Sequence, residues 1–383
     1  MVNLSEFFKK GWLLLIYLVV NGTYLLKYGV RQDYIGVIPM IVLYSIGVAI
    51  ALWLATKCAP RLNSWKKFNL SFLTLGILIA IFFVMVNLII DPETLNVLRY
   101  KGLNTTISHT LNGDYPYSTF LDEGGDTTSN LPGLFYIGLP FYLLGDVGYL
   151  QVFVFICLFG LLYKSKLSQS KKVILLFLLL LSPAYWWEVL VKSDAVSNLF
   201  LLGFFMIFWF QKYQKDYFRR PILLGVFLAL FALTRLIVAI PLFIMFFVPF
   251  LNLGWNQKLK FIASFLVAFI LIAFPIFAFV PSTEVLIEYN PLNNQTSEAP
   301  WYLSASFLLM ALLSSKKSQQ LSTVFKSSVI LVFGVVALRC LLNGFEEGFY
   351  RNIYESLFDI SYFGLVIPFI FFYLFTRKNI MHA

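Results

Sequence analysis

The amino-acid sequence predicts an all-α polytopic membrane protein, on the evidence of its composition, its apolar runs and its charge distribution. The chain has 383 residues, of which 60% are hydrophobic and only 13% are charged. Soluble domains carry about 25% charged residues, so this chain has too little polar surface to solvate a globule. Apolar runs close to the ~20 residues that cross a bilayer recur along its length.

The apolar runs predict about twelve transmembrane helices. The first run is followed at once by a second and lacks a small-residue cleavage site, so it is interpreted as a helix and not as a signal peptide. The twelve runs cover residues 11–27, 34–56, 69–90, 147–163, 172–186, 194–211, 221–235, 236–250, 260–281, 301–314, 323–343 and 360–376.

Basic and acidic residues fall on opposite sides of these helices. With a cytoplasmic N-terminus, 21 of the 29 Lys and Arg face the cytoplasm, and 17 of the 19 acids face the other side. Cytoplasmic loops are expected to be rich in Lys and Arg, so both termini are predicted to be cytoplasmic. The net charge of +10 then comes from basic cytoplasmic loops that face anionic lipid, and it does not indicate nucleic-acid binding.

An additional apolar segment, "LPGLFYIGLPFYLLG" at 131–145, is short and contains two prolines. If it crossed the membrane, every later basic cluster would move to the outer side. We therefore predict a re-entrant or interfacial helix that is buried against protein, within a large outer loop at 91–146. The chain divides into an N-terminal transmembrane hairpin (1–68), a central membrane module (69–250) and a C-terminal transmembrane module (251–383).

Motifs for soluble chemistry are absent from the sequence. Cys58, Cys157 and Cys340 lie in or beside apolar runs at no metal-ligand spacing. No P-loop, dinucleotide-binding turn, HExxH motif or nucleophile elbow occurs. An activated substrate would therefore arrive through the membrane or from the outer side.

Acidic residues at helix ends are the first candidates for chemistry. Asp91 lies where the apolar run 69–90 ends, and Glu93 follows two residues later. A carboxylate at the membrane surface is incompletely solvated, which raises its basicity and suits a general base for a hydroxyl. The structural alternative is an Asp-Pro pair that ends the helix, because Pro92 cannot continue it.

Asp194 and Glu188 lie near the start of a later helix. Asp194 could simply cap that helix. Glu188 follows Tyr185, Trp186 and Trp187, which form either an interfacial aromatic belt or a platform on which sugar rings pack.

Arginines within or next to the predicted membrane segments are the third group of candidates. Arg235 and Arg339 are flanked by apolar residues, and such charges are costly and usually functional, although long side chains can also snorkel to the interface. Arg351 lies in the last outer loop. A guanidinium fork suits phosphate, so these three residues predict a site for an anionic headgroup, to which His109 and Lys101 could contribute.

The order of motifs after Asp91 is informative. The loop contains "LNGDYPYS" with Leu111, Gly113, Pro116 and Tyr117. An apolar helix over 132–145 follows, then "LSP", "SDA" and "LGVFLALFALTR". This order resembles the GT-C superfamily of integral-membrane glycosyltransferases, which use polyprenyl-phosphate sugars and whose bacterial members often show an L-x-G-x-x-P-Y element. The resemblance covers about 69–250 and extends to the C-terminal third only in general plan.

The resemblance implies roles for the candidate residues. Asp91 would be the base that deprotonates the acceptor, Asp194 (or Glu188) would help to bind acceptor or metal, and Arg235, Arg339 and Arg351 would bind the lipid phosphate. Asp91, Glu93 and Asp194 together would offer the oxygen ligands that Mg²⁺ or Mn²⁺ prefers. Family members differ in metal dependence, so the sequence leaves the metal open.

The sequence also departs from the family pattern. Two helices precede the helix that is usually first, and Asn-Leu-Pro-Gly-Leu (130–134) replaces the usual Tyr-Pro-Pro-Leu. The first difference indicates an accessory hairpin, and the second weakens the placement of the helix after it.

The expected function is inverting transfer of a monosaccharide from a polyprenyl-phosphate donor to a hydroxyl of a glycan, lipid or protein acceptor. It would take place on the outer face of a bacterial cytoplasmic membrane and would build a cell-envelope glycan. One alternative is a transporter or lipid flippase that uses the same cavity, which an inverted repeat or paired broken helices would favour. Another is a glycan polymerase or ligase, for which the largest outer loop would lie nearer the C-terminus.

Overall fold

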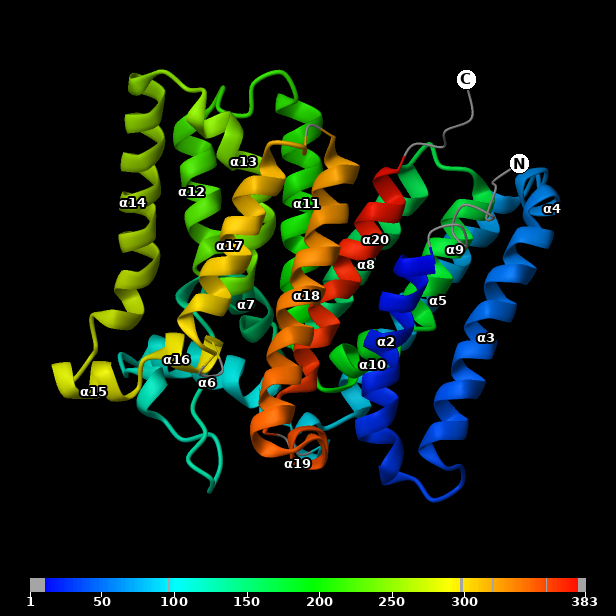
Figure 1. Ribbon diagram of the computed structural model, residues 1–383, viewed down its shortest axis with the longest axis horizontal. Helices are drawn as coiled ribbons and strands as arrows, with labels where there is room; N and C mark the ends of the chain where they lie inside the picture. The colour runs from blue at the N-terminus through cyan, green and yellow to red at the C-terminus, as the bar shows by residue number, and fades with distance from the viewer. Residues whose placement is uncertain (1–10, 96, 297–298, 319, 356, 378–383) are drawn as a thin grey trace.

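A computed structural model describes residues 11–377, except 96, 297–298, 319 and 356. The described residues form helices and one isolated β-bridge, between Phe120 and Thr127. Most of the long helices run side by side from the upper to the lower end of the molecule, and short helices lie at the lower end (Figure 1). These include α6 (Arg99–Asn112), α15 (Thr283–Glu288) and α16 (Pro291–Thr296).

Six of the described helices are long and apolar enough to cross a membrane: α2 (Gly11–Tyr28, continued to Arg31), α3 (Val37–Lys57), α5 (Phe68–Ile89), α11 (Ala195–Tyr213), α14 (Trp255–Phe277) and α18 (Leu321–Glu347). The pair α9 (Gln169–Leu180) and α10 (Pro183–Leu190) adds a seventh if it counts as one span. Shorter apolar helices are α7 (Pro132–Leu143), α8 (Tyr149–Lys164), α12 (Pro221–Ala232), α13 (Ala239–Leu251), α17 (Trp301–Ser315) and α20 (Ile367–Thr376). This architecture fits an integral membrane protein, whereas the number twelve stays a prediction.

The bend between α9 and α10 has a local cause. The two helix axes meet at 61°, at Pro183, which has no N–H to continue the helical hydrogen bonds. The Ser182 hydroxyl accepts from the Tyr185 amide at 3.2 Å. The buried Asn21 side chain accepts from the Ser182 hydroxyl at 2.6 Å and from the Ala184 amide at 3.2 Å. The polar groups freed by the break are thus satisfied inside the protein, as a membrane requires.

Helix α7 is short, and residues at its start and just beyond its end contact the ends of α12 and α5. Its 12 residues are about 18 Å long, which is short of the ~30 Å hydrocarbon core. The Gly133 amide donates to the Leu233 carbonyl at the end of α12, at 2.6 Å. After α7, Gly148 packs against Asn87 in the last turn of α5. The re-entrant or interfacial placement of α7 stays a prediction from the charge distribution, since α12, which is predicted to cross the membrane, has the same length.

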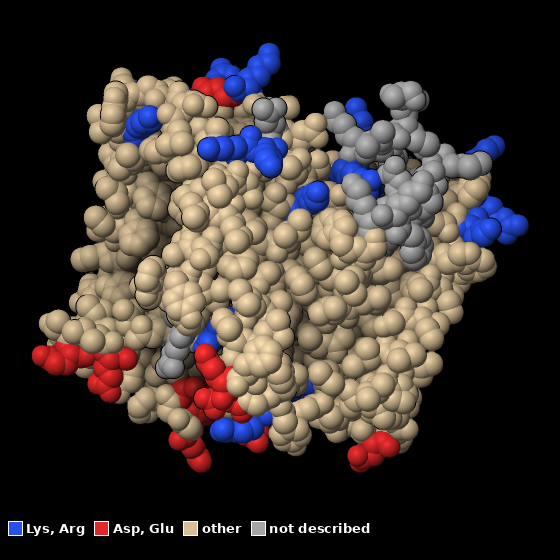
Figure 2. Space-filling model, in the orientation of Figure 1, with Lys and Arg blue, Asp and Glu red and all other residues tan. Residues whose placement is uncertain are grey.

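Charged residues separate along the helix axes. Basic residues gather at the upper end and acidic residues at the lower end, where a few basic residues also occur (Figure 2). We call these the basic end and the acidic end. Described segments at the basic end include α4 (Ala59–Asn63) and the end of α20, whereas α15 and α19 (Phe349–Tyr354) lie at the acidic end. The separation has the form that the positive-inside rule predicts.

The three segments predicted from the sequence share one hydrophobic core. A continuous cluster of buried side chains extends from Leu13 in α2 to Leu374 in α20. A second cluster lies beneath the loop at the acidic end, where Ile107 of α6, Leu134 of α7 and Ile276 of α14 pack together. The second cluster fixes the loop 91–146 against the ends of the membrane helices.

Candidate functional site

Two adjoining cavities open at the acidic end. The larger has a volume of about 650 Å³ and is polar, and the smaller, of about 270 Å³, is mainly apolar. Arg339 and Tyr362 line both, so the cavities meet at these two residues. The charged residues of the larger cavity, here called the polar cavity, are Lys27, Arg31, Arg99, Asp126, Arg339, Glu347 and Asp359. The apolar cavity is lined chiefly by Leu236, Ile237, Ile240, Leu303, Phe307, Leu308, Val335, Val336, Phe358 and Leu365, together with Arg235 and Gln295.

Arg235 and Asp194 form a buried ion pair. The Asp194 Oδ2 atom accepts from Arg235 Nη2 at 2.5 Å and from Nε at 3.1 Å. Arg235 occupies the extended break between α12 and the short helix η4 (Leu236–Val238). Only 2% of the Arg235 side chain and 1% of the Asp194 side chain are exposed. A buried charge is tolerated when it is paired, and each of these residues supplies the partner of the other.

The start of α11 leaves the Asp194 carboxylate available for this pair. Asp194 precedes α11 but makes no capping hydrogen bond. The Glu188 carboxylate instead accepts from the Ser197 amide at 2.8 Å, and the Ser193 hydroxyl accepts from the Ala195 amide at 3.2 Å. Glu188, a predicted acceptor or metal ligand, is therefore fully buried as a cap of α11.

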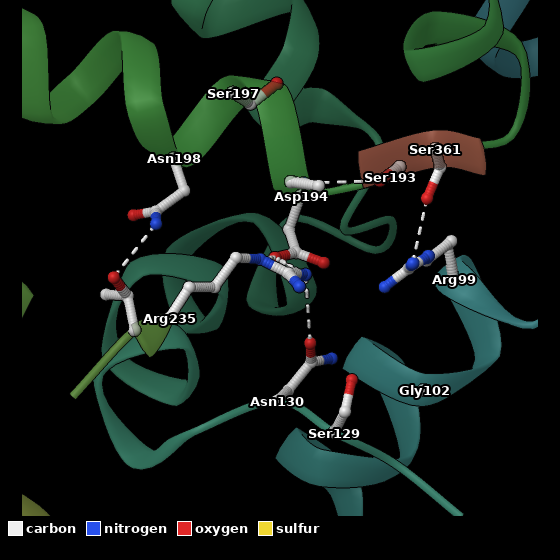
Figure 3. A network of polar contacts seen from close by, with 12 residues as sticks. Arg99, Gly102, Ser129, Asn130, Ser193, Asp194, Ser197, Asn198, Arg235 and Ser361 are labelled. Atoms are coloured by element: carbon white, nitrogen blue, oxygen red, sulfur yellow. Dashed lines mark hydrogen bonds and ion pairs between the residues drawn. The ribbon is translucent and has the colours of Figure 1, made fainter. Parts of the chain in front are cut away.

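Asn130 links the Asp194–Arg235 pair to the polar cavity. Arg235 Nη2 donates to Asn130 Oδ1 at 3.4 Å, and Figure 3 shows the guanidinium between Asp194 and Asn130. Asn130 lines the polar cavity, whereas Arg235 lines the apolar one. The guanidinium thus lies in the wall between the two. Among the described residues, Asp194 Oδ1 is buried without a hydrogen-bond partner.

Arg99 and Asp359 form a second ion pair, in the wall of the polar cavity. Arg99, the first residue of α6, also donates to the Ser361 hydroxyl at 2.9 Å (Figure 3). Burial by itself would raise the pKa of Asp359, but Arg99 and the hydrogen bonds from Ser361 outweigh burial and lower this pKa below its usual value. Asp359 is therefore charged at neutral pH and serves as a counter-ion, not as a base.

Asp126 differs from the other carboxylates of the polar cavity. Asp126 is an exposed residue that lines this cavity, and partial burial together with the neighbouring Asp122 raises its pKa. Glu347 lies 3.3 Å from Arg351 and Asp359 pairs with Arg99, whereas no ion pair within 4 Å involves Asp126 in the part of the chain that the structure describes. A carboxylate with a raised pKa is the better proton acceptor.

Asp91 and Glu93 are exposed residues at the end of α5. Asp91 Oδ1 accepts from the Glu93 amide at 3.0 Å, as the helix-ending alternative expects. Neither residue lines the two cavities. Both lie close enough to Tyr100 to affect its pKa, which burial, Asp146, Glu93 and Asp91 together raise. Asp91 is therefore near the first turn of α6 but outside the cavity walls.

The structure does not bring the predicted metal ligands together. Asp91 and Glu93 are exposed, while Asp194 is buried and turned toward Arg235. In the described ranges, no group of three or more His, Cys, Asp or Glu side chains is arranged to hold a metal ion.

The remaining predicted phosphate ligands are dispersed. Arg339 lines both cavities, and its Nη1 lies 4.0 Å from Glu346. Arg351 is exposed between Glu347 and Glu355, at 3.3 and 3.1 Å. The His109 ring lies 3.3 Å from the Thr119 hydroxyl. Neither Arg351 nor His109 lines either cavity. The structure thus brings Arg235 and Arg339 to one site and leaves the other two outside it.

Sequence reasoning missed several cavity residues, among them Lys27, Arg31, Arg99 and Asp126. The predicted position relative to the membrane could have indicated Lys27, Arg31 and Arg99. Eight of the 29 Lys and Arg lie outside the cytoplasmic set, and five of these eight line the two cavities: Lys27, Arg31, Arg99, Arg235 and Arg339.

Comparison with known protein families, curated proteins and solved structures gives no match to this chain.

Proposed function

We propose that this protein is a glycosyltransferase of the GT-C type that moves a monosaccharide from a polyprenyl-phosphate donor to an acceptor hydroxyl. The observation that supports it most strongly is the junction of an apolar and a polar cavity at an arginine. A lipid-linked sugar has an apolar chain, an anionic phosphate and a polyhydroxylated ring in that order. The apolar cavity, Arg339 and the polar cavity follow the same order.

The apolar cavity suits the prenyl chain. It lies between α13, α17 and α18, and Leu303, Phe307 and Val335 contribute to its wall. Leu236 lines the cavity and is also exposed, so the wall continues into the apolar surface of the molecule. A donor could therefore enter sideways from the bilayer without leaving hydrocarbon surroundings.

The phosphate would bind beside Arg339, where the cavities meet. Arginine presents a planar fork of donors that fits phosphate oxygens, and the charge-assisted hydrogen bonds would strengthen as negative charge grows on the leaving phosphate. Arg235 would add positive charge from the wall, held in place by Asp194 and Asn130.

The reaction requires a base that takes the proton of the acceptor hydroxyl, whose oxygen then attacks the anomeric carbon with inversion and displaces the lipid phosphate. The family resemblance assigns this role to Asp91. The cavity geometry favours Asp126, which lines the polar cavity and has a raised pKa. Asp91 stays the prediction of the resemblance, and Asp126 is the structural alternative to test beside it.

A transporter or lipid flippase is the second candidate function, because the bent pair α9–α10 has the geometry of a broken span or a re-entrant loop, and broken spans occur in transporters. Transport requires a path to the other side. A third cavity, of about 380 Å³, lies at the basic end between α11, α18 and α20 and shares no lining residue with the polar or apolar cavity. The cavities therefore favour chemistry at one end over passage through the protein.

The acidic end would be the outer face, with the termini in the cytoplasm of a bacterium, since Lys and Arg concentrate at the basic end.

Steady-state transfer by Arg339→Gln tests the proposal. The purified protein in proteoliposomes would receive labelled polyprenyl-phosphate sugars, with Arg61→Gln at the exposed basic end as the matched control. We expect Arg339→Gln to lose at least about tenfold in kcat/KM, because it removes a charge-assisted contact to the leaving phosphate, and Arg61→Gln to match wild type. Unchanged transfer by Arg339→Gln would refute the phosphate site.

A further inference from the structure

We propose that the N-terminal hairpin adds an anion-binding subsite to the polar cavity, in which Lys27 and Arg31 bind a phosphate or carboxylate group carried by the acceptor saccharide. This inference rests on the proposed function and narrows its acceptor to an anionic saccharide. It also assigns a role to the hairpin formed by α2 and α3.

Lys27 and Arg31 stand next to each other in the cavity wall. The α2 helix continues as a 3₁₀ turn through Gly29–Arg31, so both residues lie at the same end of this helix. Both side chains line the polar cavity. The Arg31 guanidinium carbon lies 4.9 Å from the centre of the Tyr28 ring, a cation–π contact that restricts where the guanidinium can go.

Neither cation forms an ion pair within 4 Å in the described part of the chain. Asp359 lies close enough to Lys27 to interact with it electrostatically. The Asp359 carboxylate is already paired with Arg99 and accepts from the Ser361 amide. Like charges four residues apart repel each other, and positive charge is disfavoured in outer segments. An anionic ligand would relieve both costs, and charge-assisted contacts to it would be strong.

The surroundings of this pair suit a saccharide better than a lipid headgroup alone. The Trp187 and Tyr28 rings, whose centres are 6.2 Å apart, both line the polar cavity. Thr127 and Asn294 place a hydroxyl and an amide elsewhere in the same wall, where the Asn294 amide donates to the Thr127 hydroxyl at 3.0 Å. Aromatic rings beside hydroxyl and amide groups match the apolar faces and hydroxyl rim of a sugar ring.

Binding of simple probes to the full chain in nanodiscs of neutral phosphatidylcholine tests the subsite. The probes are glucose 6-phosphate, glucose and inorganic phosphate, titrated against wild type and Lys27→Gln/Arg31→Gln. The control is Lys57→Gln/Arg61→Gln, which removes two exposed cations with the same four-residue spacing at the basic end. The melting temperature of each variant confirms that it is folded.

We expect wild type to bind glucose 6-phosphate at least about tenfold more tightly than glucose, because charge-assisted hydrogen bonds are roughly twice as strong as neutral ones. The Lys27→Gln/Arg31→Gln variant should lose this preference, and the control should keep it. A preference that survives in Lys27→Gln/Arg31→Gln would overturn the inference. Equal affinity for inorganic phosphate and glucose 6-phosphate would also overturn the inference. The same holds for loss of sugar-phosphate binding when anionic lipid is added to the nanodisc. Either result indicates an anion site without saccharide recognition.

Transfer from a polyprenyl-phosphate sugar to a neutral acceptor, measured on the same samples, separates the two proposals. Binding of glucose 6-phosphate through Lys27 and Arg31 without any transfer would refute the transferase alone. Transfer without the anionic preference would refute the subsite alone.

Discussion

The substitution Asp194→Asn tests whether the buried pair with Arg235 holds the wall between the cavities. The pair combines contacts of 2.5 and 3.1 Å with almost complete burial of both side chains. At about 3 Å and an effective dielectric constant of about 20, two unit charges attract by roughly 5 kcal/mol. Removal of one partner from a buried pair costs about 3–5 kcal/mol, because the other charge stays desolvated. The electrostatic attraction and the expected loss of stability are therefore of similar size.

Thermal unfolding in detergent is the assay. We expect Asp194→Asn to lower the melting temperature by roughly 5–15 °C, which corresponds to a loss of about 3–5 kcal/mol in a chain of this size. The control is Glu355→Gln, which breaks the exposed contact to Arg351 and should cost about 0–1 kcal/mol. An Asp194→Asn shift no larger than that of Glu355→Gln would refute the reasoning.

The double substitution Asp194→Leu/Arg235→Met separates stability from activity. An apolar replacement of a buried ion pair is often neutral or stabilising, so the double variant should regain most of the melting temperature. It should nevertheless transfer less sugar than wild type, since the guanidinium and its N–H donors are gone from the cavity wall.

Three further predictions concern the base, the metal and pH. We expect Asp91→Asn to lower kcat by a factor of about 10²–10⁴, the usual contribution of a general base. If Asp126→Asn shows a loss of that size while Asp91→Asn stays active, the general base is Asp126. The structure does not bring Asp91, Glu93 and Asp194 together as one set of metal ligands, so treatment with EDTA should leave transfer unchanged. Loss of transfer in EDTA that Mg²⁺ or Mn²⁺ restores would contradict this prediction. The folded-state pKa of Asp359 lies below its usual value. The pairing of Asp359 with Arg99 therefore stabilises the protein above about pH 4, and this stabilisation is lost as the pH falls through the folded-state pKa. In melting curves between pH 7 and pH 3, Asp359→Asn should abolish this part of the acid destabilisation, and an unchanged acid transition would refute the prediction.

Local sequence properties predicted the parts of the fold that depend on neighbouring residues. Apolar runs identified the helices because burial in lipid requires consecutive apolar residues. The charge clusters predict that the segment 131–145 does not cross the membrane, because a full crossing would reverse all later loops, and this placement stays a prediction. The prediction of one run over 172–186 missed the bend, although Pro183 is a local signal for it. Only the contact from Asn21, which is more than 160 residues away, could not be inferred from neighbouring residues.

The candidate site was harder to predict because its contacts are long-range. Arg235 could be identified as a costly charge near membrane depth, but its partner Asp194 is 41 residues away and looked like a helix cap. The position of Asp91 at a helix end did not determine whether its side chain reaches a cavity. Lys27 and Arg31 carry no motif, and only the three-dimensional arrangement places them beside Arg99.

The donor requirement and stereochemistry of transfer test the central claim most directly. Purified wild type in proteoliposomes would receive a labelled polyprenyl-phosphate monosaccharide of known anomeric configuration, and NMR would give the configuration of the new glycosidic bond. The account predicts transfer that depends on the polyprenyl phosphate and inverts the anomeric centre. Retention of configuration, or the absence of transfer from every polyprenyl-phosphate sugar while lipid crosses the bilayer, would contradict it.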